Sequence, residues 1–308
     1  PHIFWVIFLV ALPAQILFGV TTMTIASVVT AYAWGLLYFS ITGTFFFRDA
    51  FIPIAVFLGM HLLFTDPATS PKTEIGRVIF GSLYAMFTIA FAAILEAGNA
   101  PAFYDKLLPI PILNMMVKRI DRVAVAAVDR IPELLLAFNQ SLGATRHRLA
   151  VVALWVVTFL GMSASGGVGD DHPGQYLPFW EEACSGENER ACEYVVVMKT
   201  NFCDRGSGWA CNELGIHRAA LEGDPAGALR AMIRSCDLSF SPGCDNVLRL
   251  TTGETPLAQA QPQLEDLPIV LRGSKGFVEE ETPAELYALA CKRGWANMCD
   301  RIADQTAP

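Results

Sequence analysis

The chain has 308 residues, of which 53% are hydrophobic and 17% are charged, and its formal net charge is −8. Its mean hydropathy of +0.40 is too high for an ordinary soluble protein. The charge is uneven, because residues 1–168 carry a net +2 and residues 169–308 carry a net −10. This composition predicts a membrane part followed by an acidic soluble part, and it excludes a basic nucleic-acid-binding protein.

Five apolar stretches are candidates to cross a bilayer as helices, because lipid offers no partners to unpaired backbone groups. Four of them form an expected bundle over residues 1–97, and the fifth helix is expected within residues 149–166. The third stretch is short and contains Pro53, so a kinked or broken span is expected there. The five stretches cover residues 3–21, 23–47, 51–64, 78–95 and 149–162.

The first residues are already inside an apolar run and include no Met. A signal peptide would show a basic start, a short apolar core and a cleavage site of small residues, and none of these is visible. We therefore expect an earlier part of the protein to precede Pro1.

Orientation follows from the positive charge between the fourth and fifth stretches, in residues 98–148. An excess of Lys and Arg marks the cytoplasmic side of a membrane protein. The fifth helix then carries the cysteine-rich residues 167–308 to the opposite side, which in a bacterium is the oxidising periplasm. Counting back, we expect residues 66–77 outside, and Arg48 and Asp49 inside. The expected location is the bacterial inner membrane, with a periplasmic C-terminal domain.

Residues 112–127 of this basic cytoplasmic segment predict an amphipathic helix. Lys118, Arg119 and Arg122 lie mainly off its apolar side. Such a helix is typical of one that lies at the membrane interface, and binding of another protein along that side is the alternative. Its expected apolar side consists of Ile112, Met115, Met116, Ile120, Val123 and Ala127.

Residues 65–77, between the third and fourth stretches, contain two prolines and several hydroxyl side chains. By physical chemistry alone this pattern is a turn followed by an N-capped helix. With Phe80 and Gly81 after it, the string also resembles a signature of membrane subunits in ion-pumping flavin complexes. These complexes are the Rnf-type electron transport complex and the sodium-pumping NADH:quinone reductase. The residues that carry the resemblance are Asp66, Pro67, Thr69, Ser70, Pro71, Gly76 and Arg77.

The resemblance covers about residues 45–125, and in the family this motif lies in the later half of the protein. It implies a two-repeat helical membrane fold and flavin, one flavin being joined to a threonine by a phosphodiester. Residues 139–145 are the only candidate for that threonine string, and they depart from the family at Asn139 and Leu142. They also follow the motif instead of preceding it, so we interpret them as a loop.

No catalytic residue is identified, and no metal site is expected. Flavin or quinone is implied by the resemblance only. The candidates to contact such a cofactor are Thr69, Ser70 and His61. A structural role is the alternative for each of them, because a histidine near a span can be neutral and hydrogen-bonded, and hydroxyls cap helices.

Eight cysteines fall in four pairs with the same Cys-x7-Cys spacing. Eight residues of straight helix span about 12 Å, whereas a disulfide requires Cα atoms about 4.4–6.8 Å apart. The chain must therefore turn within each pair, and each disulfide is expected to join the end of one helix to the start of the next. The expected pairs are Cys184 with Cys192, Cys203 with Cys211, Cys236 with Cys244, and Cys291 with Cys299.

Residues around these pairs predict helices with defined starts, such as Asp224 before Pro225 and the capping box of Thr282 and Glu285. The Ala-Cys and Gly positions resemble the cysteine-rich Sel-like repeat, a relative of the tetratricopeptide repeat. The period is irregular, with an insertion at about residues 251–276. The expected fold class is thus all-α, a helical membrane bundle followed by a disulfide-linked helical repeat.

Three functions remain open at this point. The first is an integral membrane subunit of an electron-transport complex, whose partners are other membrane subunits, the bilayer and a periplasmic protein bound by the repeat domain. The second is a non-catalytic scaffold of a larger membrane complex. The third is a fragment of a transporter, which the interrupted third stretch favours.

Overall fold

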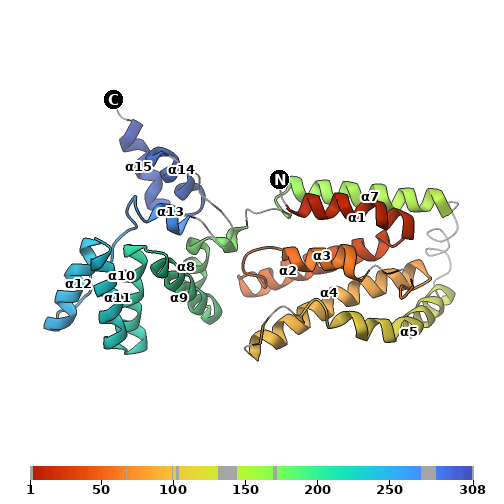
Figure 1. Cartoon of the computed structure of the whole chain (residues 1–308), viewed down its shortest axis with the longest axis horizontal. Helices are drawn as coiled ribbons and strands as arrows, with labels where there is room; N and C mark the ends of the chain where they lie inside the picture. Colours follow the sequence, from red (N-terminus) through yellow and green to blue (C-terminus); the bar gives the residue numbers. More distant parts are fainter. Residues whose placement is uncertain are drawn as a thin grey trace. The chain divides into compact units, whose positions relative to one another are not determined.

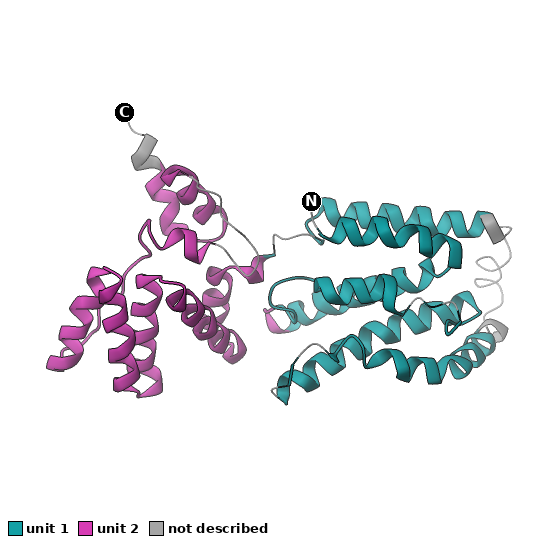
Figure 2. Cartoon of the chain, viewed as in Figure 1, with its two compact units in different colours: residues 1–41, 45–172 teal, residues 42–44, 173–308 magenta. Residues whose placement is uncertain are grey.

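The computed structural model describes residues 3–64, 66, 68–98, 100–101, 104–130, 144–168, 172–271 and 282–306. Every regular element in these ranges is a helix, as the all-α prediction requires. The chain divides into two compact units (Figure 2). Unit 1 comprises Pro1–Ile41 with Phe45–His172, and unit 2 comprises Thr42–Thr44 with Pro173–Pro308.

Three helices of unit 1 are long and apolar enough to cross a membrane: Thr21–Thr42, Glu74–Ala97 and Arg146–Ala164. The predicted first and third spans are apolar helices too, but they are shorter, at Ile3–Phe18 and Ile54–Leu63. The third changes from an α-helix to a π-helix at Gly59, shortly after Pro53. The helices of unit 1 are α1 (Ile3–Phe18), α2 (Thr21–Thr42), α3 (Ile54–Leu58), η1 (Gly59–Leu63), α4 (Glu74–Ala97), α5 (Pro109–Arg130) and α7 (Ala144–Ala164) (Figure 1).

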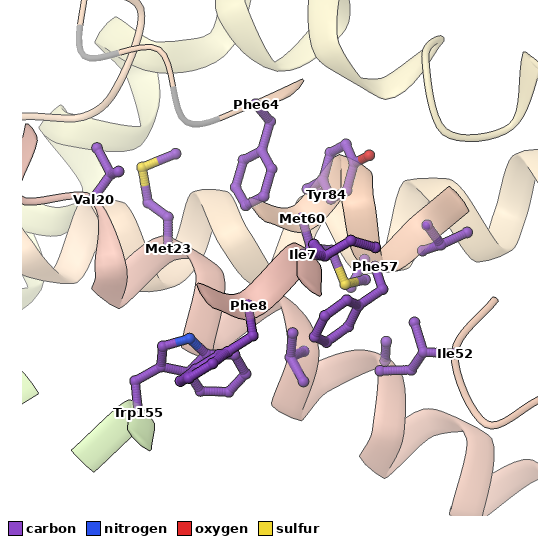
Figure 3. Close-up of a cluster of buried hydrophobic side chains, with 14 of the residues drawn as sticks. Ile7, Phe8, Val20, Met23, Ile52, Phe57, Met60, Phe64, Tyr84 and Trp155 are labelled. Atoms are coloured by element: carbon purple, nitrogen blue, oxygen red, sulfur yellow. The ribbon is translucent and has the colours of Figure 1, made fainter. Parts of the chain in front are cut away.

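The core of unit 1 is rich in aromatic side chains and draws on α1, α2, α3, η1, α4, α5 and α7. Figure 3 shows part of this cluster. Phe8 of α1 stacks on Phe159 of α7, with the ring centroids 4.0 Å apart. On the outer surface of the same two helices, Val10 is 64% exposed and Val157 is 66% exposed. Apolar side chains on both the inner and the outer surface are typical of helices in lipid.

Helix α5 packs against α4 and runs antiparallel to it. Tyr84, in the middle of α4, donates a hydrogen bond to the carbonyl of Lys106, just before α5 begins. Asp121, in the second half of α5, accepts hydrogen bonds from residues just before α4 begins. The chain therefore turns back after α4 and returns to the end of the unit from which α4 starts.

Helix α5 buries one part of its apolar surface and leaves another part exposed. Leu113, Ile120 and Ala124 are buried, whereas Met115 is 78% exposed and Val123 is 61% exposed. Met115 and Val123 belong to the predicted apolar side, which is thus partly open to the surroundings, and its contact with a membrane interface or a partner remains a prediction.

Unit 2 is a chain of short helices in which each disulfide-linked pair packs together. Helices α9, α10, α11 and α12 also pack each on the next. Its elements are η3 (Pro173–Gln175), α8 (Leu177–Ser185), α9 (Glu189–Asp204), α10 (Gly208–His217), η4 (Arg218–Glu222), α11 (Pro225–Asp237), α12 (Ser241–Thr252), α13 (Leu267–Val270), α14 (Pro283–Lys292) and α15 (Ala296–Thr306).

All four predicted disulfides are present, with Cα–Cα distances of 4.6 to 4.9 Å. In every pair the first cysteine is the last but one residue of its helix, and the second is the fourth residue of the next helix. The predicted joining of one helix end to the next helix start is confirmed. The bonded pairs are Cys184 with Cys192, Cys203 with Cys211, Cys236 with Cys244, and Cys291 with Cys299.

The linker within each disulfide is the same in all four pairs. The residue three positions after the first cysteine has a positive φ, and the next amide donates to the carbonyl just before that cysteine. In each linker, one residue in the left-handed conformation ends the first α-helix, and the next helix begins directly after it. The repeated geometry explains why the spacing is invariant. The four positive-φ residues are Glu187, Ser239, Gly206 and Gly294, with φ of 63°, 64°, 100° and 97°.

The predicted insertion is packed onto the helices of unit 2. We call its residues 254–266 the strap. Asn246 of α12 pairs with both backbone groups of Ala258, at 2.7 and 2.8 Å, and the Trp209 indole donates to the carbonyl of Ala260. Asp266 is buried and accepts hydrogen bonds from the Ser207 hydroxyl and the Trp209 amide at the start of α10.

Near the strap, Lys199 lies 2.9 Å from a carboxylate oxygen of Glu181 and 3.7 Å from one of Glu213. Burial raises the pKa of Glu213, and the positive charge of Lys199 opposes that rise. At the start of α14, hydrogen bonds from the backbone and hydroxyl of Thr282 lower the pKa of Glu285, and the predicted capping box is confirmed.

Two of the four positive-φ linker residues, Glu187 and Ser239, are not glycine, and we expect each to lower the stability of unit 2. A side chain in the left-handed region costs about 1–2 kcal/mol, which glycine avoids. We expect Glu187→Gly and Ser239→Gly each to raise the free energy of unfolding by about 1 kcal/mol. We expect Gly206→Ala, where an added Cβ meets nothing within 4 Å, to lower it by a similar amount.

Chemical denaturation of the detergent-solubilised chain, followed by the signal of its tryptophans, measures these changes. Glu187→Ala is the control, because it removes the same side chain and keeps the left-handed cost. Equal effects of Glu187→Gly and Glu187→Ala contradict the prediction.

Candidate functional site: the motif loop and its carboxylate clamps

The motif loop of residues 66–73 is organised around the carboxylate and carbonyl of Asp66. The Asp66 carboxylate accepts hydrogen bonds from the amide of Ala68 and the hydroxyl of Thr69, both at 3.1 Å. Its carbonyl accepts the hydroxyl of Ser70 at 2.5 Å. The loop is thus a turn closed by its own side chains.

A second carboxylate, that of Asp121 on α5, clamps the same loop from outside. It accepts hydrogen bonds from the backbone amides of Lys72 and Thr73 and from the Thr73 hydroxyl, at 2.9 to 3.3 Å. The Thr73 hydroxyl is also the N-cap of α4, because it accepts the amide of Gly76 at 3.1 Å. One aspartate thereby holds the start of α4 onto α5, although 48 residues separate it from Thr73.

Gly76 is required by this clamp. A Cβ at position 76 would lie 2.6 Å from the Thr73 hydroxyl oxygen and 2.7 Å from a carboxylate oxygen of Asp121. Real Cβ atoms do not approach oxygen so closely, so any larger residue displaces the cap or the clamp. The motif glycine therefore has a packing reason in this chain.

A third carboxylate, Glu74, joins the starts of α2, α4 and α7. It accepts the Thr22 hydroxyl of α2 at 2.7 Å and forms an ion pair with Arg77 at 2.5 Å. The His147 imidazole of α7 lies 3.9 Å from the Glu74 oxygen that accepts Thr22. Arg77 also donates to the carbonyl of Pro71, which connects Glu74 back to the motif loop.

These contacts bring residues 66–77 and the basic segment after α4 to one end of unit 1, which we call the motif end. This proximity does not fit the expectation that they lie on opposite sides of a membrane. That expectation treated residues 98–148 as a segment that stays on one side, whereas α5 returns along α4 to the point where α4 began. The Arg48–Glu96 ion pair joins the loop after α2 to the last turn of α4, at the opposite end of these helices.

The structure separates the three cofactor candidates. Thr69 and Ser70 lie in the motif loop, where both hydroxyls donate to Asp66. His61 lies in η1 within the aromatic core, its ring 4.1 Å from that of Phe57 and 5.6 Å from that of Trp155. Its Nδ1 is 2.7 Å from the carbonyl of Phe57. These contacts give each of the three a structural role.

Two sequence candidates lie outside the described residues. Pro67 of the motif is one, and residues 139–143 of the candidate flavin string are the other. Sequence reasoning also missed Asp121 and Glu74, the two carboxylates that assemble the site. The only local signal was the position of Glu74 in the first turn of a capped helix, which accounts for helix capping but not for its contacts with α2 and α7.

Removing the Asp121 carboxylate tests whether it holds the motif loop. We expect Asp121→Ala to speed hydrogen–deuterium exchange at the amides of Lys72 and Thr73 by about tenfold, because a hydrogen bond to a charged group contributes about 1.5–3 kcal/mol. Arg119→Ala is the control, since Arg119 is an exposed residue on the same helix. Unchanged exchange in Asp121→Ala, or equal changes in both variants, contradicts the clamp.

Comparison with known proteins identifies no relative of the chain. No protein family, no curated protein and no solved structure matches the chain. The geometry of the two units is therefore the basis for any functional conclusion.

Proposed function

We propose that the chain is an integral membrane subunit of an electron-transport complex, in which unit 1 supplies a structural part and unit 2 binds a partner outside the cytoplasm. The supporting observation is the motif loop, because its resemblance to the ion-pumping flavin complexes coincides with a closed, carboxylate-clamped geometry. A loop with internal hydrogen bonds at the junction of several helices holds those helices in one arrangement.

The alternative is a scaffold with no redox role, and one observation favours it. The hydroxyls of Thr69 and Ser70 are both engaged by Asp66, so neither is presented to a flavin. In both proposals the protein has a structural role, in which it holds other components in place. No reaction step is assigned to its residues.

The proposed orientation differs from the one expected from sequence at two points, because it places residues 66–77 inside, and Arg48 and Asp49 outside. Basic residues gather at the motif end, so the positive-inside rule makes that end cytoplasmic. Helix α7 runs from there to the opposite end, after which unit 2 follows on the outer side. Its four disulfides suit an oxidising compartment. The motif-end cations are Lys72, Arg77, Lys118, Arg119, Arg122, Arg146 and Arg148.

A matched pair of cysteine variants tests this orientation. Ala68 in the motif loop and Ala97 at the last position of α4 are both exposed alanines of unit 1. We expect a membrane-impermeant maleimide added to intact cells to label Ala97→Cys and not Ala68→Cys. Both should be labelled after the membrane is permeabilised. Labelling of Ala68→Cys alone in intact cells overturns the orientation.

Purification of the complex tests the function itself. We expect the tagged full-length protein, extracted from its own membrane in mild detergent, to retain partner subunits in constant ratio and a flavin or quinone in the complex. Thr69→Ala with Ser70→Ala should leave the cofactor in place, since these hydroxyls are structural. Stoichiometric partners without any flavin or quinone favour the scaffold, and a partner-free protein without cofactor contradicts both.

A further inference from the structure

We propose that a groove at the motif end binds the headgroup of an anionic phospholipid. The groove has a volume of about 630 Å³ and is bounded by the motif loop on one side and by α5 on the other. The proposal rests on the membrane location of unit 1 but not on its redox role.

The charge of the groove is positive, although a carboxylate lines it. Lys72, Lys118 and Arg122 contribute three exposed cationic side chains. Asp121 is the acidic lining residue, and its oxygens already accept hydrogen bonds from Lys72 and Thr73. The three cations outnumber this one carboxylate, so the groove favours a phosphate group.

The apolar part of the groove indicates lipid rather than a soluble phosphate. Val117, Val125 and Ala126 line it from α5, and Val125 is 49% exposed. On the same helix, Met115 and Val123 are also open to the surroundings. A phospholipid offers both a phosphate for the cations and acyl chains for these side chains, as in other basic pockets at the ends of membrane helices.

Ser70 of the motif loop also lines the groove. It is 8% exposed, but its hydroxyl donates to the carbonyl of Asp66. Because this hydroxyl is already used within the motif loop, recognition of an anion falls to the long cationic side chains of the lining. Such a site selects for negative charge and not for one particular headgroup.

A double substitution on α5 with a matched control tests the site. The purified full-length protein in detergent is titrated with phosphatidylglycerol, and bound lipid is counted by native mass spectrometry. We expect Lys118→Gln with Arg122→Gln to weaken phosphatidylglycerol binding by about thirtyfold, because each cation near a membrane surface contributes about 1 kcal/mol. Arg119→Gln removes a charge from the same helix outside the groove and should leave binding within about twofold of the wild type.

Two further arms separate the possible sources of the signal. Phosphatidylcholine should bind no better to the wild type than to the double variant, and inorganic phosphate at millimolar concentration should not displace phosphatidylglycerol. Equal loss in Arg119→Gln overturns the proposal in favour of diffuse surface charge. Displacement by inorganic phosphate overturns it in favour of a soluble anion, and unchanged binding in the double variant overturns it outright.

Discussion

The arrangement of unit 1 depends on one carboxylate, that of Asp121, which binds the backbone just before α4. Four hydrogen bonds converge on its two oxygens, so the interaction satisfies amides that no helix would otherwise pair. Because Asp121 belongs to α5, the same contacts determine that α5 runs back along α4. The location of the basic residues of α5 and the groove between α5 and the motif loop both follow from this return.

The packed position of the Asp121 carboxylate is favourable because the neighbouring residues supply hydrogen-bond donors. The amides of Lys72 and Thr73 and the Thr73 hydroxyl replace the water that the carboxylate loses on packing against the loop. The Glu74 carboxylate likewise accepts a hydrogen bond from the Thr22 hydroxyl and forms an ion pair with Arg77. These carboxylates thus have hydrogen-bond or ion-pair partners where they lie, at the end of a bundle whose helices α2, α4 and α7 are long and apolar enough to cross a membrane.

Sequence alone predicted those features that depend on nearby residues. The disulfide pairs follow from spacing, because the chain must turn for Cys184 to reach Cys192. The Thr282 capping box follows from residues three positions apart. The direction of α5 could not be predicted in this way, because Thr73 and Asp121 are distant in the chain and no local pattern marks them as partners. Nor was the positive φ at Glu187 predictable, since no glycine stands there.

The four disulfides of unit 2 have a consequence for how this unit matures. Each bridge joins cysteines only eight positions apart, so its two sulfurs meet as soon as one helix end and the next helix start have formed. Correct pairing then needs no contact from elsewhere in the chain. In an oxidising environment each bridge can therefore form before the rest of unit 2 is assembled, so the native set does not depend on the order in which the helices pack.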